Sequence, residues 1–103
     1  MVITNEIEKL VKEAPIVPIT TVSAKGEPHL IVVGQVKEVK DNDVLVFGIF
    51  KMETTQQNIK ETGTMQVALA SKDGGPKGYR LTGTASIEGE KILFKANKAE
   101  SLM

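Results

Sequence analysis

The sequence contains no cysteine and no tryptophan, and it has a single histidine, His29. Without cysteine the chain cannot form disulfides, thiolate nucleophiles or cysteine-ligated zinc and iron–sulfur sites. One histidine offers no spaced set of metal ligands, so we expect no metal site. A catalytic histidine would need a nucleophile and an orienting acid. Since neither is indicated, we assign no catalytic residue and expect His29 to be a partly exposed strand residue.

An excess of charge is also lacking, because 13 Lys and Arg balance 13 Asp and Glu. Nucleic-acid backbones require clustered basic residues, so this balance argues against a nucleic-acid partner. No apolar run approaches the ~20 residues of a membrane-spanning helix. The N-terminus shows no charged region followed by an apolar stretch, as a signal peptide would. We therefore expect a cytoplasmic protein with no membrane partner.

The length of 103 residues fits a single domain, which we expect to span residues 1–103. A chain of this size buries only ~60–65% of the surface that it would expose when unfolded. Its core is therefore thin, and pairing with a second copy would add buried surface. A homodimer is the expected assembly.

Most of the chain has the pattern of β-strands. The segments expected to be strands are residues 16–23, 30–39, 44–50, 65–70 and 79–88. The second segment slips in its alternation between Val36 and Val39, which predicts a bulge or a sharp twist. The third is apolar on both faces, so it should be buried on both sides. Because the connections are mostly of hairpin length, we expect an antiparallel sheet curled into a barrel.

Three helices are expected beside the strands. In the first, over residues 3–14, apolar residues recur at the spacing of one helical face, and Asn5 and Glu8 have the spacing of a capping box. This helix should cover an open end of the core. The other two are expected over residues 54–61 and 90–100.

The segment with the clearest chemical content is residues 46–59, where an apolar strand runs into a helix start. Thr54 can cap this helix, with Gln57 completing a capping box. The free N–H groups and the positive end of the helix dipole form an anion pocket. Lys51 and the hydroxyls of Thr54 and Thr55 can add bonds of about 1.5–3 kcal/mol each. The alternative is an ordinary cap that binds nothing, and it stays open.

Three motifs occur in order along the chain. They are Glu27-Pro28-His29-Leu30-Ile31, then Met52-Glu53-Thr54-Thr55-Gln56-Gln57-Asn58-Ile59, and finally Gly78-Tyr79-Arg80-Leu81-Thr82-Gly83-Thr84-Ala85. With these motifs, residues 1–90 resemble the FMN-binding split barrels of the pyridoxamine 5'-phosphate oxidase-like family. The resemblance implies a mainly β fold with short helices, an antiparallel split β-barrel.

The resemblance also implies a cofactor site for FMN at a homodimer interface. The segment Val32, Val33, Gly34 and Gln35 would lie along the flavin ring, and residues 51–55 would hold the phosphate. The cofactor-binding residues implied are Val32, Val33, Gly34, Gln35, Lys51, Met52, Thr54 and Thr55. Gly34 itself has two interpretations from the residues alone: a position where a planar ring approaches the backbone, or a bulge glycine.

The sequence departs from the family pattern in two places. Thr54 stands where several relatives have a phosphate-binding Lys or Arg, and Lys51 lies one turn earlier. The chain also ends soon after Phe94, where many relatives continue through a further strand that helps to close the barrel.

The resulting hypothesis is a small FMN-binding flavoprotein that acts as an oxidoreductase or an electron carrier with an undefined small-molecule redox partner. Whether it is an enzyme, an FMN-dependent oxidoreductase, stays open. The alternative is a split-barrel binding module for another ligand, such as a deazaflavin or haem, or one with no cofactor. A purely structural barrel is a third hypothesis. A nicotinamide site is not expected, because no Gly-x-Gly-x-x-Gly opens a helix after a strand.

Overall fold

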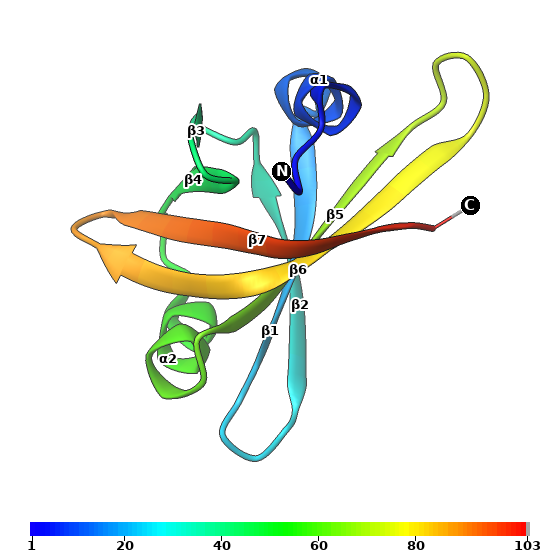
Figure 1. The fold of residues 1–103 in the computed structure, drawn as a ribbon. Coiled ribbons are helices and arrows are strands. Elements are labelled where there is room, and N and C mark those ends of the chain that lie inside the picture. Colours follow the sequence, from blue (N-terminus) through cyan, green and yellow to red (C-terminus); the bar gives the residue numbers. More distant parts are fainter. Residues whose placement is uncertain (103) are drawn as a thin grey trace.

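Residues 1–102, which the computed structural model describes, form one antiparallel sheet and two helices (Figure 1). The elements are α1 (Asn5–Glu13), β1 (Ile16–Val22), β2 (Pro28–Gly34), β3 (Glu38–Lys40), β4 (Val44–Gly48), α2 (Glu53–Glu61), β5 (Thr64–Ser71), β6 (Lys77–Glu88) and β7 (Lys91–Ser101). The strands follow the order β2-β1-β5-β6-β7-β4-β3. The expected fold class, a mainly β split barrel, is confirmed.

The barrel is open between the two ends of this order. Among the described strands, β2 pairs only with β1 and β3 pairs only with β4. Residues 35–37 join β2 to β3, and the Lys37 N–H donates to the Val46 carbonyl over 2.8 Å. The chain therefore crosses the opening once, and the edge of β2 stays without a strand partner.

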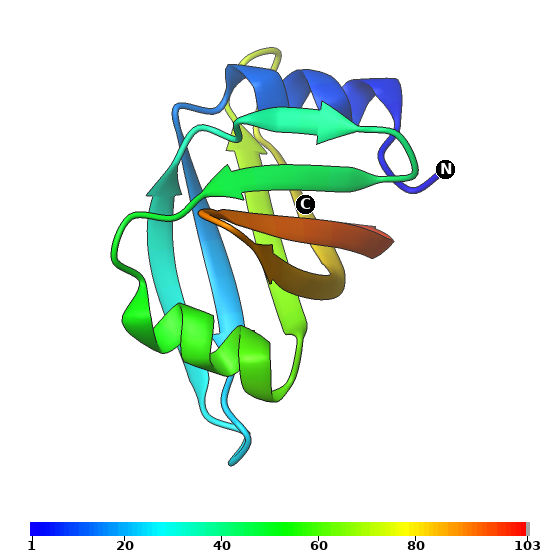
Figure 2. The same cartoon turned by 90° about the vertical axis from the view of Figure 1, so that its left-hand side faces the viewer.

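The helices lie at opposite ends of the barrel, α1 at one end and α2 at the other (Figures 1 and 2). Helix α1 buries Ile7, Leu10 and Val11, as expected from their spacing. Its cap was predicted wrongly. Thr4, in extended backbone geometry, caps the helix by accepting from the Ile7 N–H over 3.3 Å, and Asn5 is already helical.

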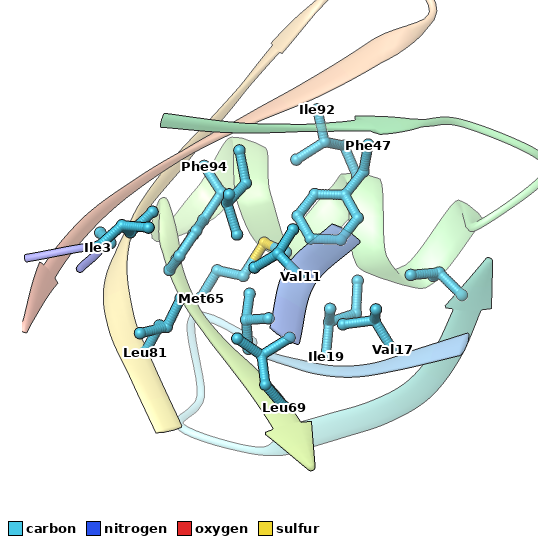
Figure 3. Packing of buried hydrophobic residues seen from close by; sticks show 14 of the residues in the cluster. Ile3, Val11, Val17, Ile19, Phe47, Met65, Leu69, Leu81, Ile92 and Phe94 are labelled. Atoms are coloured by element: carbon cyan, nitrogen blue, oxygen red, sulfur yellow. The ribbon is translucent and has the colours of Figure 1, made fainter. Parts of the chain in front are cut away.

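The core draws side chains from α1 and from the strands around the barrel (Figure 3). Phe47, Met65, Leu81 and Phe94 are among its fully buried members. Each such side chain stabilises the fold by about 1.5–3 kcal/mol relative to exposure. In β4, three consecutive residues are buried, which confirms the expectation that this strand is covered on both faces.

The segment expected to be a C-terminal helix is strand β7, so that prediction is wrong. Ile92, Phe94 and Ala96 alternate at the period of a strand, and all three are buried. β7 lies between β6 and β4 and pairs with both. Residues 91–101 therefore form an interior strand of the sheet, and both edges of this strand are paired.

The expected strand over residues 30–39 is two strands. β2 ends at Gly34 and β3 begins at Glu38. The slip in alternation between Val36 and Val39 reflects this break and not a bulge within one strand. β2 and β3 are the two ends of the strand order, so the chain crosses from one edge of the sheet to the other between them. The alternation of inward and outward side chains is therefore interrupted there. The register shift in the sheet lies instead between β6 and β7, at Thr82 and Gly83.

Candidate functional site

A groove of about 730 Å³ opens at the split in the barrel. One side is formed by β2 and the link to β3, and the other by the end of β4 and the link to α2. The lining residues are Ile31, Val32, Val33, Gly34, Gln35, Val36, Lys37, Phe47, Gly48, Ile49, Phe50 and Met52. Its volume lies within the roughly 300–1,000 Å³ of small-molecule and cofactor sites.

The wall formed by β2 and the link to β3 contains all four residues expected beside a flavin ring. Val33 points toward the core and is buried, whereas Val32 is 59% exposed. Because β2 has a strand on one side only, backbone N–H and C=O groups along its other edge are available to a ligand. The Gln35 side chain donates to the Lys12 carbonyl over 2.6 Å, which ties the end of this wall to α1.

Gly34 is not a bulge glycine. Its pairing with Ile16 continues the regular β1–β2 register, and its φ is not positive. A Cβ placed on Gly34 would meet no atom within 4 Å. Neither a turn nor packing within residues 1–102 requires glycine at this position.

The opposite wall ends in a strained turn. Phe47 is buried at the base of the groove, and Phe50 at its rim is 79% exposed. The next two residues, Lys51 and Met52, have φ values of 62° and 58°. Left-handed geometry at a non-glycine residue costs of order 1–3 kcal/mol, and such residues cluster at functional sites. The Lys51 ammonium lies 5.7 Å from the centre of the Phe50 ring.

Helix α2 begins one residue earlier than expected. Met52 is its N-cap and has no side-chain capping bond, so the predicted cap at Thr54 is wrong. The Gln57 side chain bonds Glu61 over 2.8 Å and does not close a capping box. The left-handed turn aligns the Met52 carbonyl with the Gln56 N–H at 2.8 Å, and this bond sets the start of the helix.

The first N–H groups of α2 are free of protein acceptors. Within residues 1–102, no hydrogen bond uses the N–H of Glu53, Thr54 or Thr55. The Thr55 hydroxyl is buried and has no partner in the same part of the chain. A buried polar group without a partner costs about 1–3 kcal/mol, so an ordered water or a ligand that bonded this hydroxyl would stabilise the helix start.

The structure brings together part of the predicted site. Val32, Val33, Gly34, Gln35 and Met52 share the groove. Lys51 and Thr54 are exposed beside its end, and Thr55 is buried beneath the start of α2; none of these three lines the groove.

Sequence reasoning missed the residues opposite β2. They are Phe47, Gly48, Ile49 and Phe50, together with Val36 and Lys37. A glycine at the end of a buried strand, as at Gly48, was the available signal for a close approach.

The groove contains no acid–base or nucleophilic set. Its lining has one ionisable residue, Lys37, and one side-chain amide, Gln35. His29 lies on β2, half-buried, and does not line the groove. In residues 1–102 no group of His, Asp and Glu could hold a metal ion. Nor does this part of the chain contain a helix long and apolar enough to cross a membrane. The groove lining therefore offers apolar surface, backbone groups, one ammonium and one amide.

A family model described as pyridoxamine 5'-phosphate oxidase matches residues 3–101. The chain belongs to the pyridoxamine 5'-phosphate oxidase family. Among the curated proteins, nothing matches this family member.

Several solved structures share the fold of this chain at low sequence identity. HupZ of Group A Streptococcus has a TM-score of 0.83 at 20% identity, over 96% of this chain and 93% of HupZ. An FMN-binding protein from Syntrophomonas wolfei subsp. wolfei has a TM-score of 0.74 at 20% identity, over 92% and 82%. HutZ, the heme storage protein from Vibrio cholerae, has 0.63 at 12%, over 97% and 92%. The same fold therefore occurs in proteins named for different ligands.

Proposed function

We propose that the chain binds FMN non-covalently in the groove and transfers electrons, as an oxidoreductase or an electron carrier in the cytoplasm. One observation carries this proposal: a single groove joins the open edge of β2 at Gly34 to Met52, the residue at which α2 begins. A planar ring on an apolar wall, next to a helix N-terminus for a phosphate, is the shape and charge distribution of FMN.

The residues fit the ring portion of FMN. The walls are mostly aliphatic and aromatic, which suits a flat ring system. The absence of a side chain at Gly34 leaves the backbone of β2 accessible, and its unpaired edge can hydrogen-bond the polar side of the ring. When bound, the flavin supplies the redox chemistry, so the protein needs to bind, orient and tune it. This division of labour accounts for a groove without catalytic side chains.

The residues also fit a phosphate. The three free N–H groups at the start of α2 and the positive end of the helix dipole attract a dianion. The unpartnered hydroxyl of Thr55 is a further donor at the same helix start. Lys51 directly precedes the N-cap Met52, and its positive charge would compensate for the neutral residue at Thr54.

A homodimer completes the proposal. Ile16, Leu30 and Val32 are between 59% and 67% exposed. The β1–β2 register places them on one face of the sheet, because Ile16 pairs with Gly34 two positions beyond Val32. Exposed apolar side chains gathered on one face indicate a covered surface. Because Val32 also lines the groove, a second copy on this face would reach the bound ligand.

Haem is the second candidate ligand, since HutZ has the same fold and Thr54 leaves the phosphate corner less basic than expected. Haem iron requires an axial protein ligand, usually His, Cys, Met or Tyr. Met52 is the one residue of these types among those lining the groove. Iron ligation by the groove would therefore depend on a single thioether, which favours FMN.

The first test is a titration of the purified protein with FMN and with riboflavin, followed by flavin fluorescence. We expect saturable quenching with both ligands. The double change Lys51→Ala and Thr55→Ala should weaken FMN at least about tenfold, the effect of losing one charge-assisted bond, and leave riboflavin nearly unchanged.

Lys60→Ala is the matched control, because Lys60 is an exposed lysine in the last turn of α2. Equal losses for FMN and riboflavin in the double variant would remove Lys51 and Thr55 from the phosphate role. A wild-type protein that binds neither flavin would refute the proposed function.

A further inference from the structure

Lys37 is the one charged residue among those lining the groove. Its backbone is held in place, because its N–H donates to the Val46 carbonyl of β4 over 2.8 Å. Its side-chain stem lies against the backbone of β4: a Cβ placed on Gly48 would be 2.9 Å from Lys37 Cε. The absence of a side chain at Gly48 therefore makes room for the lysine stem on the groove wall.

The described residues place no carboxylate in an ion pair with Lys37. The groove lining contains no Asp or Glu. Lys37 is exposed, so solvent screens its ammonium, but a positive charge beside an apolar cleft still contributes a positive potential inside that cleft.

We propose that Lys37 is the residue that makes the groove favour a negatively charged ring, and so tunes the reduction potential of the bound flavin. This inference rests on the proposed binding of FMN. It concerns the ring, and a role of Lys37 at the phosphate would instead weaken FMN and not riboflavin.

The charge balance of flavin reduction connects Lys37 to the potential. Oxidised flavin has a neutral ring. Uptake of two electrons and one proton leaves the ring with one negative charge. An ammonium beside the bound ring would stabilise this reduced form more than the oxidised form and would raise the two-electron potential. Differential binding of the two redox states is the only way in which the protein can shift their equilibrium.

The test compares Lys37→Gln with wild type in FMN affinity and in the midpoint potential of bound FMN, with dithionite as the reductant. We expect the preference for reduced over oxidised FMN to fall about tenfold, which for two electrons lowers the midpoint potential by about 30 mV. Lys37→Arg should retain most of the wild-type potential. Gly48→Ala should lower it without removing the charge, because the new methyl group displaces the lysine stem.

Lys40→Gln is the matched control, since Lys40 is an exposed lysine at the end of β3 and does not line the groove. It should leave the potential unchanged. If Lys37→Gln binds FMN with an unaltered potential, or if it weakens FMN but not riboflavin, the inference is refuted while FMN binding stands. If the wild-type protein binds no flavin, the proposed function itself fails.

Discussion

At the scale of single residues, Asp43 fastens the N-terminal segment to the turn before β4. One of its carboxylate oxygens accepts from the N–H groups of Val2 and Ile3 at 3.0 and 2.8 Å. Ile3 is buried in the core, so these bonds hold a core residue in place. The bond from Ile3 is the main cause that keeps the pKa of Asp43 below its ordinary value of 3.8.

This clip predicts a loss of stability in acid. Because the folded-state pKa lies below the unfolded one, the stabilisation is complete above about pH 4 and disappears as the pH falls through the folded pKa. We expect Asp43→Asn to lower the unfolding free energy at pH 7 by about 1 kcal/mol and to flatten its dependence on pH below 4. Asparagine tolerates the left-handed φ of 64° at this position, so the change isolates the charge.

Urea unfolding at pH 7 and pH 3 measures this effect. The neighbouring exposed residue Asp41 provides the control, because no described hydrogen bond uses its side chain. If Asp41→Asn flattens the pH dependence as much as Asp43→Asn does, the clip is not its cause.

At the scale of elements, two glycines of the sheet differ in whether packing leaves room for a side chain. Gly83 lies at the register shift between β6 and β7, and a Cβ there would approach the Lys95 carbonyl oxygen to within 1.9 Å. A Cβ at Gly34 would meet nothing within 4 Å. We expect Gly83→Ala to lower the unfolding free energy by about 3 kcal/mol or more, because the backbone of β7 must move. Gly34→Ala should change it by less than about 0.5 kcal/mol.

The same substitution in the two glycines, compared by thermal or urea unfolding, separates a packing requirement from a binding one. Gly34→Ala should weaken FMN while leaving stability unchanged. A Gly34→Ala protein that is as destabilised as Gly83→Ala would show that glycine at position 34 serves the fold.

Elements were predictable from the sequence where the local pattern and the tertiary environment agree. Helix α1 and strands β1, β4, β5 and β6 follow from periodicity, because one face or both faces meet the core. Strand β7 did not, since Ile92, Leu93 and Ala96 also fit a helix. Pairing with β6 on one side and β4 on the other decides its conformation, and neither partner is visible locally.

The site shows the same limit. Residues 32–35 and 52 were implied by the family resemblance, and they share the groove. The opposite wall depends on how β4 approaches β2, which are far apart in the sheet order. The left-handed turn at Lys51 and Met52 was also not predictable, because neither residue favours that conformation. Because of this turn α2 begins at Glu53, and its N-cap is Met52 and not Thr54.

At the scale of the whole molecule, the proposed second copy would cover the exposed apolar face and add buried surface to a small core. Leu30 on β2 is 67% exposed. It lies two residues before Val32, on the same face of the strand, and Val32 lines the groove. Leu30 itself does not line the groove. We therefore expect a change at Leu30 to affect ligand binding indirectly, through the proposed contact of a second copy with the face that Leu30 shares with Val32.

We expect Leu30→Glu to shift the protein from dimer to monomer, because a charge placed within an apolar interface is left unpaired and desolvated. Sedimentation velocity measures the assembly, and the FMN titration follows the site. If the partner helps to form the site, FMN affinity should decrease together with the dimer and recover at high protein concentration. Lys72→Glu, a charge change in the exposed β5–β6 loop, should alter neither. A wild-type monomer whose FMN affinity is unaffected by Leu30→Glu would mean that one copy of the barrel forms the whole site.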